Sequence, residues 1–384
     1  MIKRIYANNF KCLVNFEWRP SASYVNLMLG PNGSGKSTVF DCIERIRSFA
    51  MGESKVSSLF PSSTLTSWQT VSEQQFTFEI EGNGGQYRYD LELVHSEKRT
   101  YSSVSREELF FNGQPLLAFS NATTTLYGEN FSQPILTFPA DGSLSAVSLV
   151  PPSGLYRFIT WFKIALSRTA IVQIVPPMMD ETSQKELSQP SKYFENFVSW
   201  YRWISQNQGV VIRLQQELRE VLPRFSHFNL EAIGPEARVL EAVFDESDKS
   251  VTFGALSDGQ RMLIALYALL FSLKARSETV DGNVYQPASL LCLDEPDNFI
   301  APREIQPWLT AVEDFLLDRP HRLLIISHHP ESIDYCLTPS TGEAFSAFWF
   351  SREDNKHTRV QLIDPNDLGT LKPSELAARG WLRP

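Results

Sequence analysis

Two short segments of the chain are apolar without interruption, residues 290–293 (LLCL) and residues 323–326 (LLII). Uninterrupted runs of this length are typical of strands that are covered on both faces. Nearer the N-terminus, further strands are expected at residues 2–7, 14–18 and 24–29, with polar turns between them. The pattern thus predicts strands near both ends of the chain.

A second pattern, alternation of apolar and polar positions, occupies residues 76–80 and 87–93 on either side of the glycine-rich turn 82–85. This alternation predicts a hairpin in an antiparallel sheet with one exposed face. A solvated outer face is favoured over a partner surface. Four more strands are expected at residues 227–233, 238–244, 344–350 and 357–363.

Between residues 155 and 222 the spacing of apolar residues becomes helical. One face of the predicted helices carries Phe194, Phe197, Tyr201 and Ile204. These side chains are expected to form the core of a helical lobe rather than a binding cage. The segment is also too short and too irregular in its heptads for long coiled-coil arms.

Two polar stretches show neither the alternation of a strand nor the spacing of a helix. Residues 54–70 are rich in Ser and Thr and predict a loop, and residues 112–154 are rich in Asn, Thr, Ser, Pro and Gly. We interpret the second stretch as a passage between lobes. Because 384 residues are many for one compact domain, we expect one large domain with a sizeable insertion, or two lobes.

The composition is that of an ordinary soluble globular protein, with 42% hydrophobic and 21% charged residues. No apolar run approaches the ~20 residues of a membrane-spanning helix, and the N-terminus lacks the apolar segment of a secretory signal. A cytoplasmic location without a membrane partner is expected. The net charge of −9 argues against a surface devoted to nucleic acid, although it allows a local basic groove. Four scattered cysteines, Cys12, Cys42, Cys292 and Cys336, are expected to be reduced thiols.

The segment GPNGSGKST has the spacing of a phosphate-binding loop, G-x-x-x-x-G-K-[ST], and lies between a predicted strand and a helix that opens near Lys36. Its glycines allow backbone N–H groups to turn inward toward phosphate oxygens. Lys36 is expected to reach the β- and γ-phosphates, and Ser37 to contact Mg²⁺. The expected phosphate contacts are Gly30, Pro31, Asn32, Gly33, Ser34, Gly35, Lys36, Ser37 and Thr38. A chance glycine-rich turn is disfavoured because the flanking elements agree with the motif.

Two carboxylates, Asp294 and Glu295, end the apolar run 290–293. Ligands of open parallel sheets gather at the carboxyl ends of the strands, so Asp294 is expected to hold Mg²⁺ through its water shell. Glu295 is then placed to orient and deprotonate an attacking water. An acidic loop start without function is the alternative.

The segment LSDGQR, residues 256–261, precedes an apolar helix predicted at residues 262–273. Ser257 can cap this helix, whose first N–H groups would form a second anion site. Taken alone, a serine–glycine cap is a common feature. It gains weight only beside the other motifs.

A histidine, His328, follows the apolar run 323–326 and can donate a hydrogen bond to a γ-phosphate. A zinc site made of His328, His329 and Cys336 is the alternative. That alternative is disfavoured because no fourth ligand has a suitable spacing.

Together the segments GPNGSGKST, LSDGQR, LLCLDEPDN and IISHHPE resemble the ABC-type ATPase heads of the SMC and RecF kind. More closely they are similar to the compact bacterial predicted AAA ATPases of that class, and the resemblance covers roughly residues 1–50 and 250–364. It implies an α/β fold with a mixed parallel core sheet, an antiparallel N-terminal sheet and an inserted helical lobe. The implied domains are a nucleotide-binding lobe at 1–154 and 276–384 and a helical lobe at 155–275.

The resemblance also implies roles for the motifs: Walker A at Gly30 to Thr38, the ABC signature at 256–260, Walker B at 290–295, the D-loop at 297–302 and the switch histidine at His328. In this class ATP, with Mg²⁺, lies between two heads. Ser257 and Gly259 of one protomer should therefore contact the γ-phosphate held by Lys36 of the other. The resemblance implies an ATP-linked homodimer and ATP hydrolysis, with Glu295, His328 and Lys36 as catalytic residues.

Two features depart from the class. Asp258 stands where transporter signatures usually carry glycine, and a carboxylate near phosphate is unfavourable unless it points away. The glutamine of the Q-loop is not identified, since Gln133 and Gln173 are candidates by their order alone.

For the function of such an ATPase, the first hypothesis is regulation of an effector protein, a nuclease or toxin, as in bacterial anti-phage systems where similar ATPases accompany a nuclease. Only about 55 residues follow His328, fewer than a typical domain, so the effector is expected on another chain. The second hypothesis is a RecF-like DNA-repair ATPase that binds DNA directly through Lys3, Arg4, Lys11, Arg45 and Arg47. The third is a nucleotide-gated scaffold without hydrolysis, against which Glu295 argues.

Overall fold

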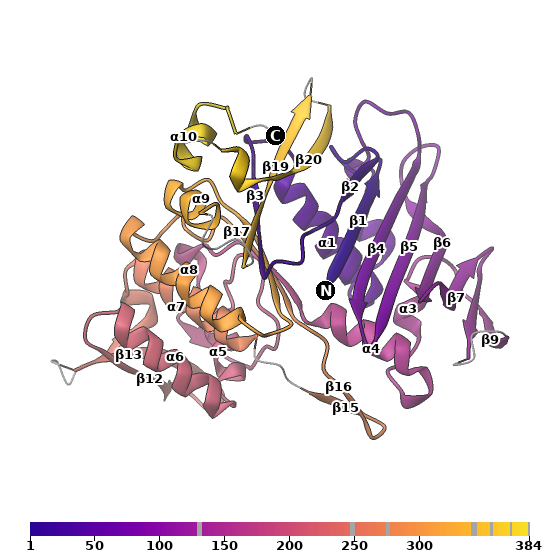
Figure 1. Ribbon diagram of the computed structural model, residues 1–384. Helices are drawn as coiled ribbons and strands as arrows, with labels where there is room; N and C mark the ends of the chain where they lie inside the picture. The colour runs from indigo at the N-terminus through magenta and orange to yellow at the C-terminus, as the bar shows by residue number, and fades with distance from the viewer. Residues whose placement is uncertain are drawn as a thin grey trace.

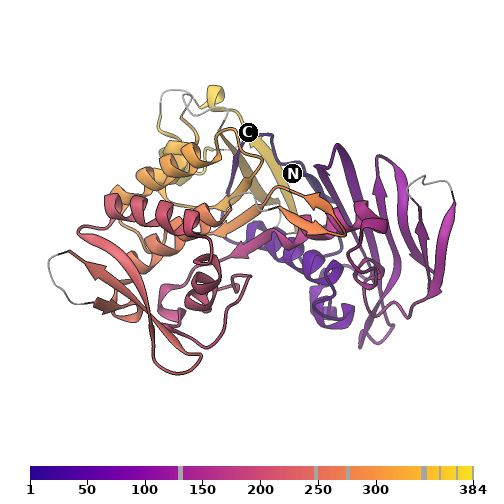
Figure 2. The same ribbon diagram turned by 90° about the horizontal axis from the view of Figure 1, so that it is seen from below.

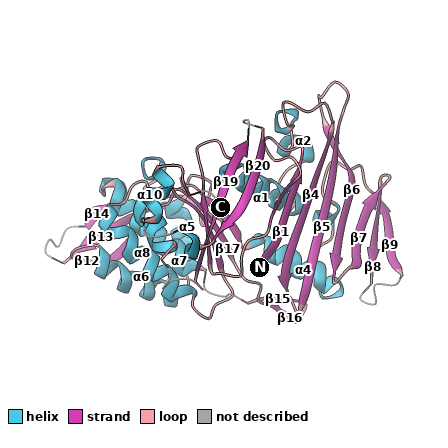
Figure 3. Cartoon of the chain, turned by 45° about the horizontal axis from the view of Figure 1, so that its top comes forward, coloured by secondary structure: helices cyan, strands magenta, loops and turns pink. Residues whose placement is uncertain are grey.

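The computed structural model describes residues 1–128, 133–245, 250–273, 277–338, 344–353, 356–368 and 371–382. Two large sheets and a group of helices make up the chain (Figure 1). Seen from below, the helical part and the larger sheet lie on opposite sides of the smaller, central sheet (Figure 2). The strand-rich and helix-rich sides are separated in the same way in Figure 3.

The central sheet has six strands in the order β10 (Thr169–Val172), β17 (Leu290–Asp294), β18 (Arg322–Ile326), β3 (Val25–Leu29), β19 (Phe345–Glu353) and β20 (His357–Ile363). The first five strands are parallel, and β20 pairs with β19 in the antiparallel sense. This arrangement confirms the predicted mixed parallel core sheet. It also places the carboxyl ends of β3, β17 and β18 at one edge.

Both faces of the central sheet are buried, which explains its uninterrupted apolar runs. Leu27 and Leu293 belong to the hydrophobic core on the side of the helices. Met28 and Cys292, their neighbours in sequence, belong to the core on the side of helix α1 (Lys36–Ala50). Successive side chains of a strand point to opposite faces, so each strand contributes to two cores.

The second sheet is antiparallel throughout its eight strands, as predicted for the N-terminal part. Its order is β2 (Phe16–Trp18), β1 (Ile2–Asn8), β4 (Glu73–Gly82), β5 (Gly85–His95), β6 (Ser102–Phe111), β7 (Gln114–Ser120), β8 (Thr123–Tyr127) and β9 (Pro134–Pro139). The expectation of a passage between lobes at 112–154 was wrong for β7 to β9, because this polar stretch pairs into the sheet. Ion pairs such as Arg4–Glu79 and Arg106–Glu108 cover the outer face. The outer face of the hairpin is therefore polar.

The helical part contains α5 (Phe197–Ile204), α6 (Gln208–Val221), α7 (Asp258–Ser272) and α8 (Pro302–Leu316). A small sheet, β11 (Thr182–Ser183), β13 (Arg238–Phe244), β12 (Phe225–Ala232) and β14 (Ser250–Thr252), lies beside them. The predicted core residues Phe194, Phe197, Tyr201 and Ile204 are buried. The longest described helices, among them α7 and α8, have 15 residues, and none forms a long coiled-coil arm.

Helix α4 (Arg157–Ser167) lies inside the range 155–275 expected for the helical lobe, but it packs elsewhere. The ring of Trp161 stacks on Tyr87 of the antiparallel sheet, with the ring centroids 4.8 Å apart. Strand β10 belongs to the central sheet. The apolar spacing of α4 identified a helix, but the spacing alone could not show which core the helix joins.

Shorter elements complete the described chain: α2 (Val56–Leu59), η1 (Ser62–Thr64), α3 (Ala146–Leu149), η2 (Gly154–Tyr156), η3 (Pro176–Met178), η4 (Phe253–Ala255), β15 (Glu278–Val280), β16 (Asn283–Tyr285), α9 (Pro330–Cys336), η6 (Pro365–Asp367) and α10 (Pro373–Ala378). Among the described residues, no helix is both long and apolar enough to cross a bilayer.

Candidate functional site

The loop after β3 turns sharply away from the sheet and leads into helix α1. Gly30 has a φ of 137°, and a Cβ there would overlap the backbone carbonyl of Phe350 on β19. Gly35 has a φ of 105° and caps α1, and a Cβ there would overlap the side chain of Thr358. Both positions therefore require glycine, because any other residue would meet strain and a clash together. The loop is held tightly between the strands and the helix.

Lys36, the first residue of α1, is only 5% exposed. Its Nζ donates hydrogen bonds to the carbonyl oxygens of Gly30 at 2.7 Å and Pro31 at 3.1 Å. Burial lowers the pKa of Lys36 to about 8, against the opposing effect of the carboxylates of Asp294 and Glu295. The ammonium group thus lies inside the loop with two carboxylates near enough to affect its charge.

Asp294 ends strand β17, in the middle of the central sheet. Burial raises the pKa of its carboxyl group, while a hydrogen bond with the Ser37 side chain and the charge of Lys36 act in the opposite direction. Among the described residues, no group of three or more His, Cys, Asp or Glu side chains could hold a metal ion. A hydroxyl and a carboxylate still fit Mg²⁺, which takes few protein ligands when phosphates and waters supply the rest.

Glu295 leaves the sheet through a left-handed backbone conformation with a φ of 50°. Its N–H donates to the carbonyl oxygen of Ile326 at 2.9 Å, which ties it to the end of β18. Its Oε2 accepts a hydrogen bond from Asn298 Nδ2 at 2.6 Å. The unusual conformation turns the carboxylate out of the sheet, and strained backbone of this kind is concentrated at functional sites.

His328 lies in the turn between β18 and helix α9. Partial burial and the nearby charge of Lys36 lower the pKa of its imidazole. The turn is held by the buried carboxylate of Asp297, which accepts hydrogen bonds from Ser327 Oγ and, at 2.5 Å, from Ser332 Oγ. The neighbouring His329 has a different part, because its Nδ1 accepts a hydrogen bond from the N–H of Glu331 and caps α9. The alternative zinc site therefore gains no support.

A cavity of about 620 Å³ lies at the carboxyl edge of the central sheet. Its walls include the loop from Asn32 to Thr38 together with Glu295 and His328. The structure thus brings Lys36, Ser37, Glu295 and His328 together from three separate elements. Trp68 and Arg352 also line the cavity, and sequence reasoning missed both. An aromatic residue within the polar stretch 54–70 was the only available signal for Trp68.

A second cavity of about 270 Å³ shares Ser37 with the first and is lined by Asp294 and Gln173. Gln173 directly follows strand β10, which pairs with β17, and so reaches the same edge of the sheet. Gln133 is exposed next to β9, the edge strand of the other sheet. Of the two candidate glutamines, the structure therefore places Gln173 beside the site.

Ser257 and Gly259 line neither cavity. Ser257 caps helix α7 in a capping box with Gln260, and its Oγ accepts a hydrogen bond from the Gln260 N–H at 3.3 Å. The carboxylate of Asp258 pairs with Arg261 at 2.5 Å. A Cβ on Gly259 would lie 3.1 Å from the carbonyl oxygen of Phe299, so this loop packs closely on the segment after Glu295. Within one chain, therefore, Ser257 and Gly259 do not line the cavity that contains Lys36.

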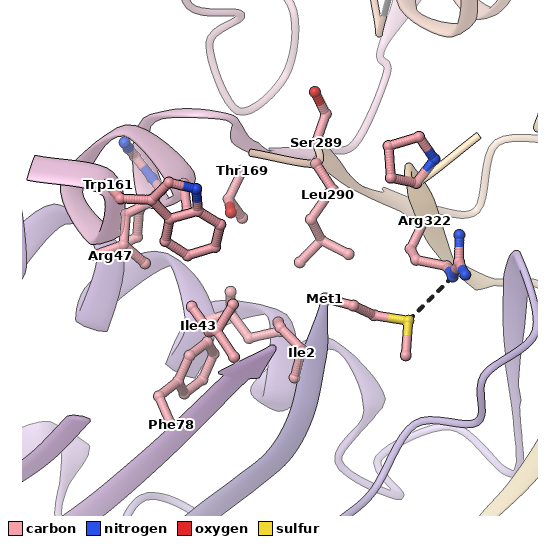
Figure 4. Close-up of a pocket in the computed structure, with 15 residues that line it drawn as sticks. Met1, Ile2, Ile43, Arg47, Phe78, Trp161, Thr169, Ser289, Leu290 and Arg322 are labelled. Carbon is pink, nitrogen blue, oxygen red and sulfur yellow. Dashed lines mark hydrogen bonds between the residues drawn. The ribbon is translucent and has the colours of Figure 1, made fainter. Parts of the chain in front are cut away.

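The apolar cavity between the two sheets is a poor candidate for a ligand site (Figure 4). Ile43, Phe78, Trp161 and Leu290 surround it, and its volume is about 30 Å³. That space holds about one water molecule. Close packing at the junction of the sheets, rather than recognition of a ligand, accounts for this cavity.

The basic residues considered for direct DNA binding are all engaged by carboxylates. Their ion pairs are Lys3–Glu81 at 2.7 Å, Arg4–Glu17 at 3.0 Å, Lys11–Asp41 at 2.8 Å, Arg45–Asp41 at 2.9 Å and Arg47–Glu44 at 2.9 Å. Neutralised cations attract nucleic acid phosphates weakly, because attraction depends on net local charge.

The chain is similar to one protein family in sequence and to several solved structures in fold. The sequence model for the RecF/RecN/SMC N terminal domain matches residues 1–337. An SMC head bound to the C-winged helix domain of ScpA is similar over 94% of this chain and 97% of its own, with a TM-score of 0.55 and 12% identity. The SMC head domain from Thermotoga maritima gives 0.50 and 13% identity, with 94% and 99% covered.

A third solved structure is the Smc head domain with an extended coiled coil bound to the C-terminal domain of ScpA, derived from Pyrococcus furiosus. It has a TM-score of 0.51 and 11% identity, and 95% of this chain and 96% of that chain are covered. No curated protein matches the sequence. At these identities the structural likeness establishes the fold alone.

Proposed function

The chain belongs to the RecF/RecN/SMC N-terminal domain family, and from this premise we propose that it is a Mg²⁺-dependent ATPase whose ATP-driven dimerisation regulates a partner effector protein. One observation carries the proposal. Lys36, Ser37, Glu295 and His328 come from three elements of the chain and line a single cavity. Such a convergence at the carboxyl edge of a parallel sheet is where nucleotides bind in open α/β folds.

The phosphate loop binds the phosphates of the nucleotide. Backbone N–H groups between Gly30 and Thr38, together with the N-terminal end of α1, attract the phosphates. Lys36 exchanges its carbonyl partners for the β- and γ-phosphates. Bound Mg²⁺, held by Ser37 and through water by Asp294, supplies charge neutralisation on the phosphates.

Glu295 is the general base of the proposed reaction. Its carboxylate accepts a proton from the water that attacks the γ-phosphate in line, while Asn298 holds one carboxylate oxygen at 2.6 Å. His328 donates a hydrogen bond to the γ-phosphate. Burial and the charge of Lys36 lower the pKa of His328 and so favour the neutral imidazole, which keeps one N–H donor.

The position of Ser257 and Gly259 outside the cavity supports the proposed dimerisation, because these residues remain available to a second copy. We propose that these residues complete the site of a second copy by contacting its γ-phosphate. The exposed capping serine presents the N-terminus of α7, a 15-residue helix, to the incoming phosphate. Asp258 does not oppose this contact, since its carboxylate is paired with Arg261.

An effector on another chain, a nuclease or toxin in anti-phage defence, is the proposed target of the dimer. Two similar SMC heads have been solved with parts of ScpA bound, which supports a head that works with a separate protein. Direct DNA binding in the RecF manner is the second candidate. The pairing of Lys3, Arg4 and Lys11 with carboxylates disfavours it.

The test is Glu295→Gln, compared with wild type by analytical ultracentrifugation with and without Mg–ATP. The variant should lose turnover and accumulate as an ATP-dependent dimer. Glu220→Gln, on the exposed side of α6, serves as a matched control and should behave as wild type. Adding Ser257→Arg to Glu295→Gln should abolish the dimer and leave ATP binding intact. A Glu295→Gln chain that hydrolyses ATP normally would refute the assignment and favour another base.

The effector is tested by copurification from the native operon with two variants. Glu295→Gln represents the ATP-bound form and Lys36→Ala the nucleotide-free form. An effector recovered preferentially with one of them supports regulation by nucleotide. No associated protein with either variant, together with strong stimulation of ATP turnover by DNA, would instead favour the RecF-like alternative.

A further inference from the structure

Trp68 is a large aromatic side chain at the wall of the phosphate-loop cavity. It is 38% exposed, whereas most aromatic residues of the chain are buried. Its neighbours in the structure are the guanidinium of Arg352, 5.7 Å from the ring centroid, and the ring of His357, at 6.1 Å and nearly edge-on. The partly exposed ring at the wall of this cavity offers an aromatic surface that a ligand in the cavity can contact.

The loop that carries Trp68 belongs to the predicted loop 54–70, and several hydrogen bonds hold it. The N–H of Thr66 donates to Asn9 Oδ1 at 3.2 Å, and the N–H of Lys11 donates to the carbonyl of Thr64 at 2.7 Å. The buried side chain of Gln74 donates to the carbonyls of both Asn9 and Thr64. These contacts tie the loop to the antiparallel sheet. The position of Trp68 relative to the cavity is therefore fixed by the fold.

Arg352 connects the ring to the phosphate loop. Its Nη1 donates to the carbonyl oxygen of Gly33 at 3.1 Å, while its guanidinium lies near the ring of Trp68. The guanidinium of Arg352 thus lies between the phosphate loop and the ring of Trp68. In a nucleotide, the ribose separates base and phosphates in a comparable way. Trp68 lines the same cavity as the loop residues Asn32 to Thr38, so the ring is within that cavity's reach of a base whose phosphates lie on the loop.

Resting on the proposed function, we propose that Trp68 is the stacking platform for the base of the bound nucleotide, with Arg352 beside the ribose and α-phosphate. Aromatic side chains bind bases through stacking, and guanidinium groups bind phosphate oxygens. Trp68 then acts on affinity for the nucleoside part alone, and Lys36 acts on the phosphates.

The experiment compares ATP with inorganic tripolyphosphate by isothermal titration calorimetry, both with Mg²⁺. Trp68→Ala should weaken ATP binding about 10- to 100-fold, the range for loss of one stacked base, and leave tripolyphosphate binding within about twofold. Trp68→Phe should keep most of the ATP affinity. Trp381→Ala removes another exposed tryptophan and is the matched control. Thermal unfolding of each variant checks the fold.

The outcomes separate this inference from the proposed function. If Trp68→Ala binds ATP like wild type while Lys36→Ala does not bind it, the platform is refuted and the ATPase stands. If Trp68→Ala loses ATP and tripolyphosphate equally, Trp68 has a structural part only and the platform is again refuted. If the wild-type chain binds neither ligand, both proposals fall.

Discussion

The ammonium group of Lys36 lies 2.7 Å from the carbonyl oxygen of Gly30, the residue that follows strand β3. The lysine therefore hydrogen-bonds with carbonyl groups of its own loop. A phosphate must replace these carbonyl partners with more negative oxygens. Because phosphate oxygens carry more negative charge than carbonyl oxygens, they favour the protonated form of Lys36. Phosphate binding and protonation of Lys36 are therefore coupled.

The coupling predicts proton uptake on ATP binding at alkaline pH. Burial lowers the pKa of Lys36 to about 8, and bound phosphates should raise it again. Binding at pH 9 should take up close to one proton, and binding at pH 7 should take up almost none. Above pH 8 the ATP affinity should fall, approaching about tenfold per pH unit.

Calorimetry in two buffers of different ionisation enthalpy measures this uptake at each pH. Lys36→Arg is the informative variant, because a guanidinium stays protonated at pH 9. If the Lys36→Arg variant still binds ATP at pH 9, its binding should take up no proton. Equal uptake at pH 7 and pH 9 in the wild-type chain would contradict the coupling.

A second prediction concerns the buried carboxylate of Asp297, which accepts hydrogen bonds from Ser327 and Ser332. Asp297→Ala leaves both hydroxyls without this acceptor and loosens the turn that carries His328. We expect the free energy of unfolding to fall by about 1–3 kcal/mol. ATP turnover should fall at least about tenfold, while ATP affinity should change little, because the phosphate loop is untouched.

Chemical denaturation and steady-state turnover check the Asp297 prediction. Asp314→Ala, at an exposed position of helix α8, is the control and should change neither quantity. Loss of stability with unchanged turnover would show that Asp297 supports the fold alone and leaves His328 in place.

The parts of the site that the sequence predicted are those whose chemistry is local. Gly30 to Thr38 form a loop from consecutive residues, so the spacing of glycines and lysine is visible in the chain itself. Asp294 and His328 each follow an apolar strand directly. Since parallel strands end at the same edge of a sheet, their proximity to the loop could be inferred without coordinates.

Other parts depend on pairings between distant segments. Gln173 reaches the site because β10 lies beside β17, and a four-residue strand gives too weak a pattern to reveal that neighbour. The loop that carries Trp68 is held by hydrogen bonds of Thr66 and Thr64: the Thr66 N–H donates to Asn9, which is far away in sequence, and the Thr64 carbonyl accepts from Gln74. Strand β9 shows no alternation because most of its side chains are exposed on both faces. Helix α4 follows the predicted boundary at residue 154 but packs on the antiparallel sheet that precedes it, a contact that its apolar spacing alone does not reveal.

The third prediction uses the buried histidine at the start of β18. His321 Nδ1 accepts a hydrogen bond from the Ser289 N–H at 3.1 Å, and its Nε2 has no hydrogen-bond partner among the described residues. Burial lowers the pKa of His321 to about 4, with the charges of Arg319 and Arg168 acting in the same direction. The folded chain therefore resists a proton that the unfolded chain binds near pH 6.5.

Because the unfolded state binds more protons between pH 6.5 and pH 4, the free energy of unfolding should fall as the pH falls through this window. The expected loss from His321 is up to about 3 kcal/mol. Denaturant unfolding at several pH values should show a shallower loss for His321→Asn, which keeps an acceptor for Ser289. His227→Asn, at an exposed position, should keep the wild-type slope. Identical slopes for both variants would exclude His321 as the source.

The last prediction distinguishes the two glutamines that the sequence left open. Gln173 lines the cavity that contains Ser37 and Asp294, and its N–H donates to the carbonyl of Lys192 at 2.8 Å, which fixes its backbone. Its side-chain amide would be an outer contact of the Mg²⁺ that Ser37 and Asp294 would hold. Gln173→Ala should therefore raise the Mg²⁺ concentration needed for half-maximal turnover by about 10- to 100-fold, the usual effect of losing an outer metal contact. Gln133→Ala, on the edge of the other sheet, should leave this requirement unchanged. Turnover titrated with Mg²⁺ at saturating ATP measures both, and equal requirements would remove Gln173 from the metal site.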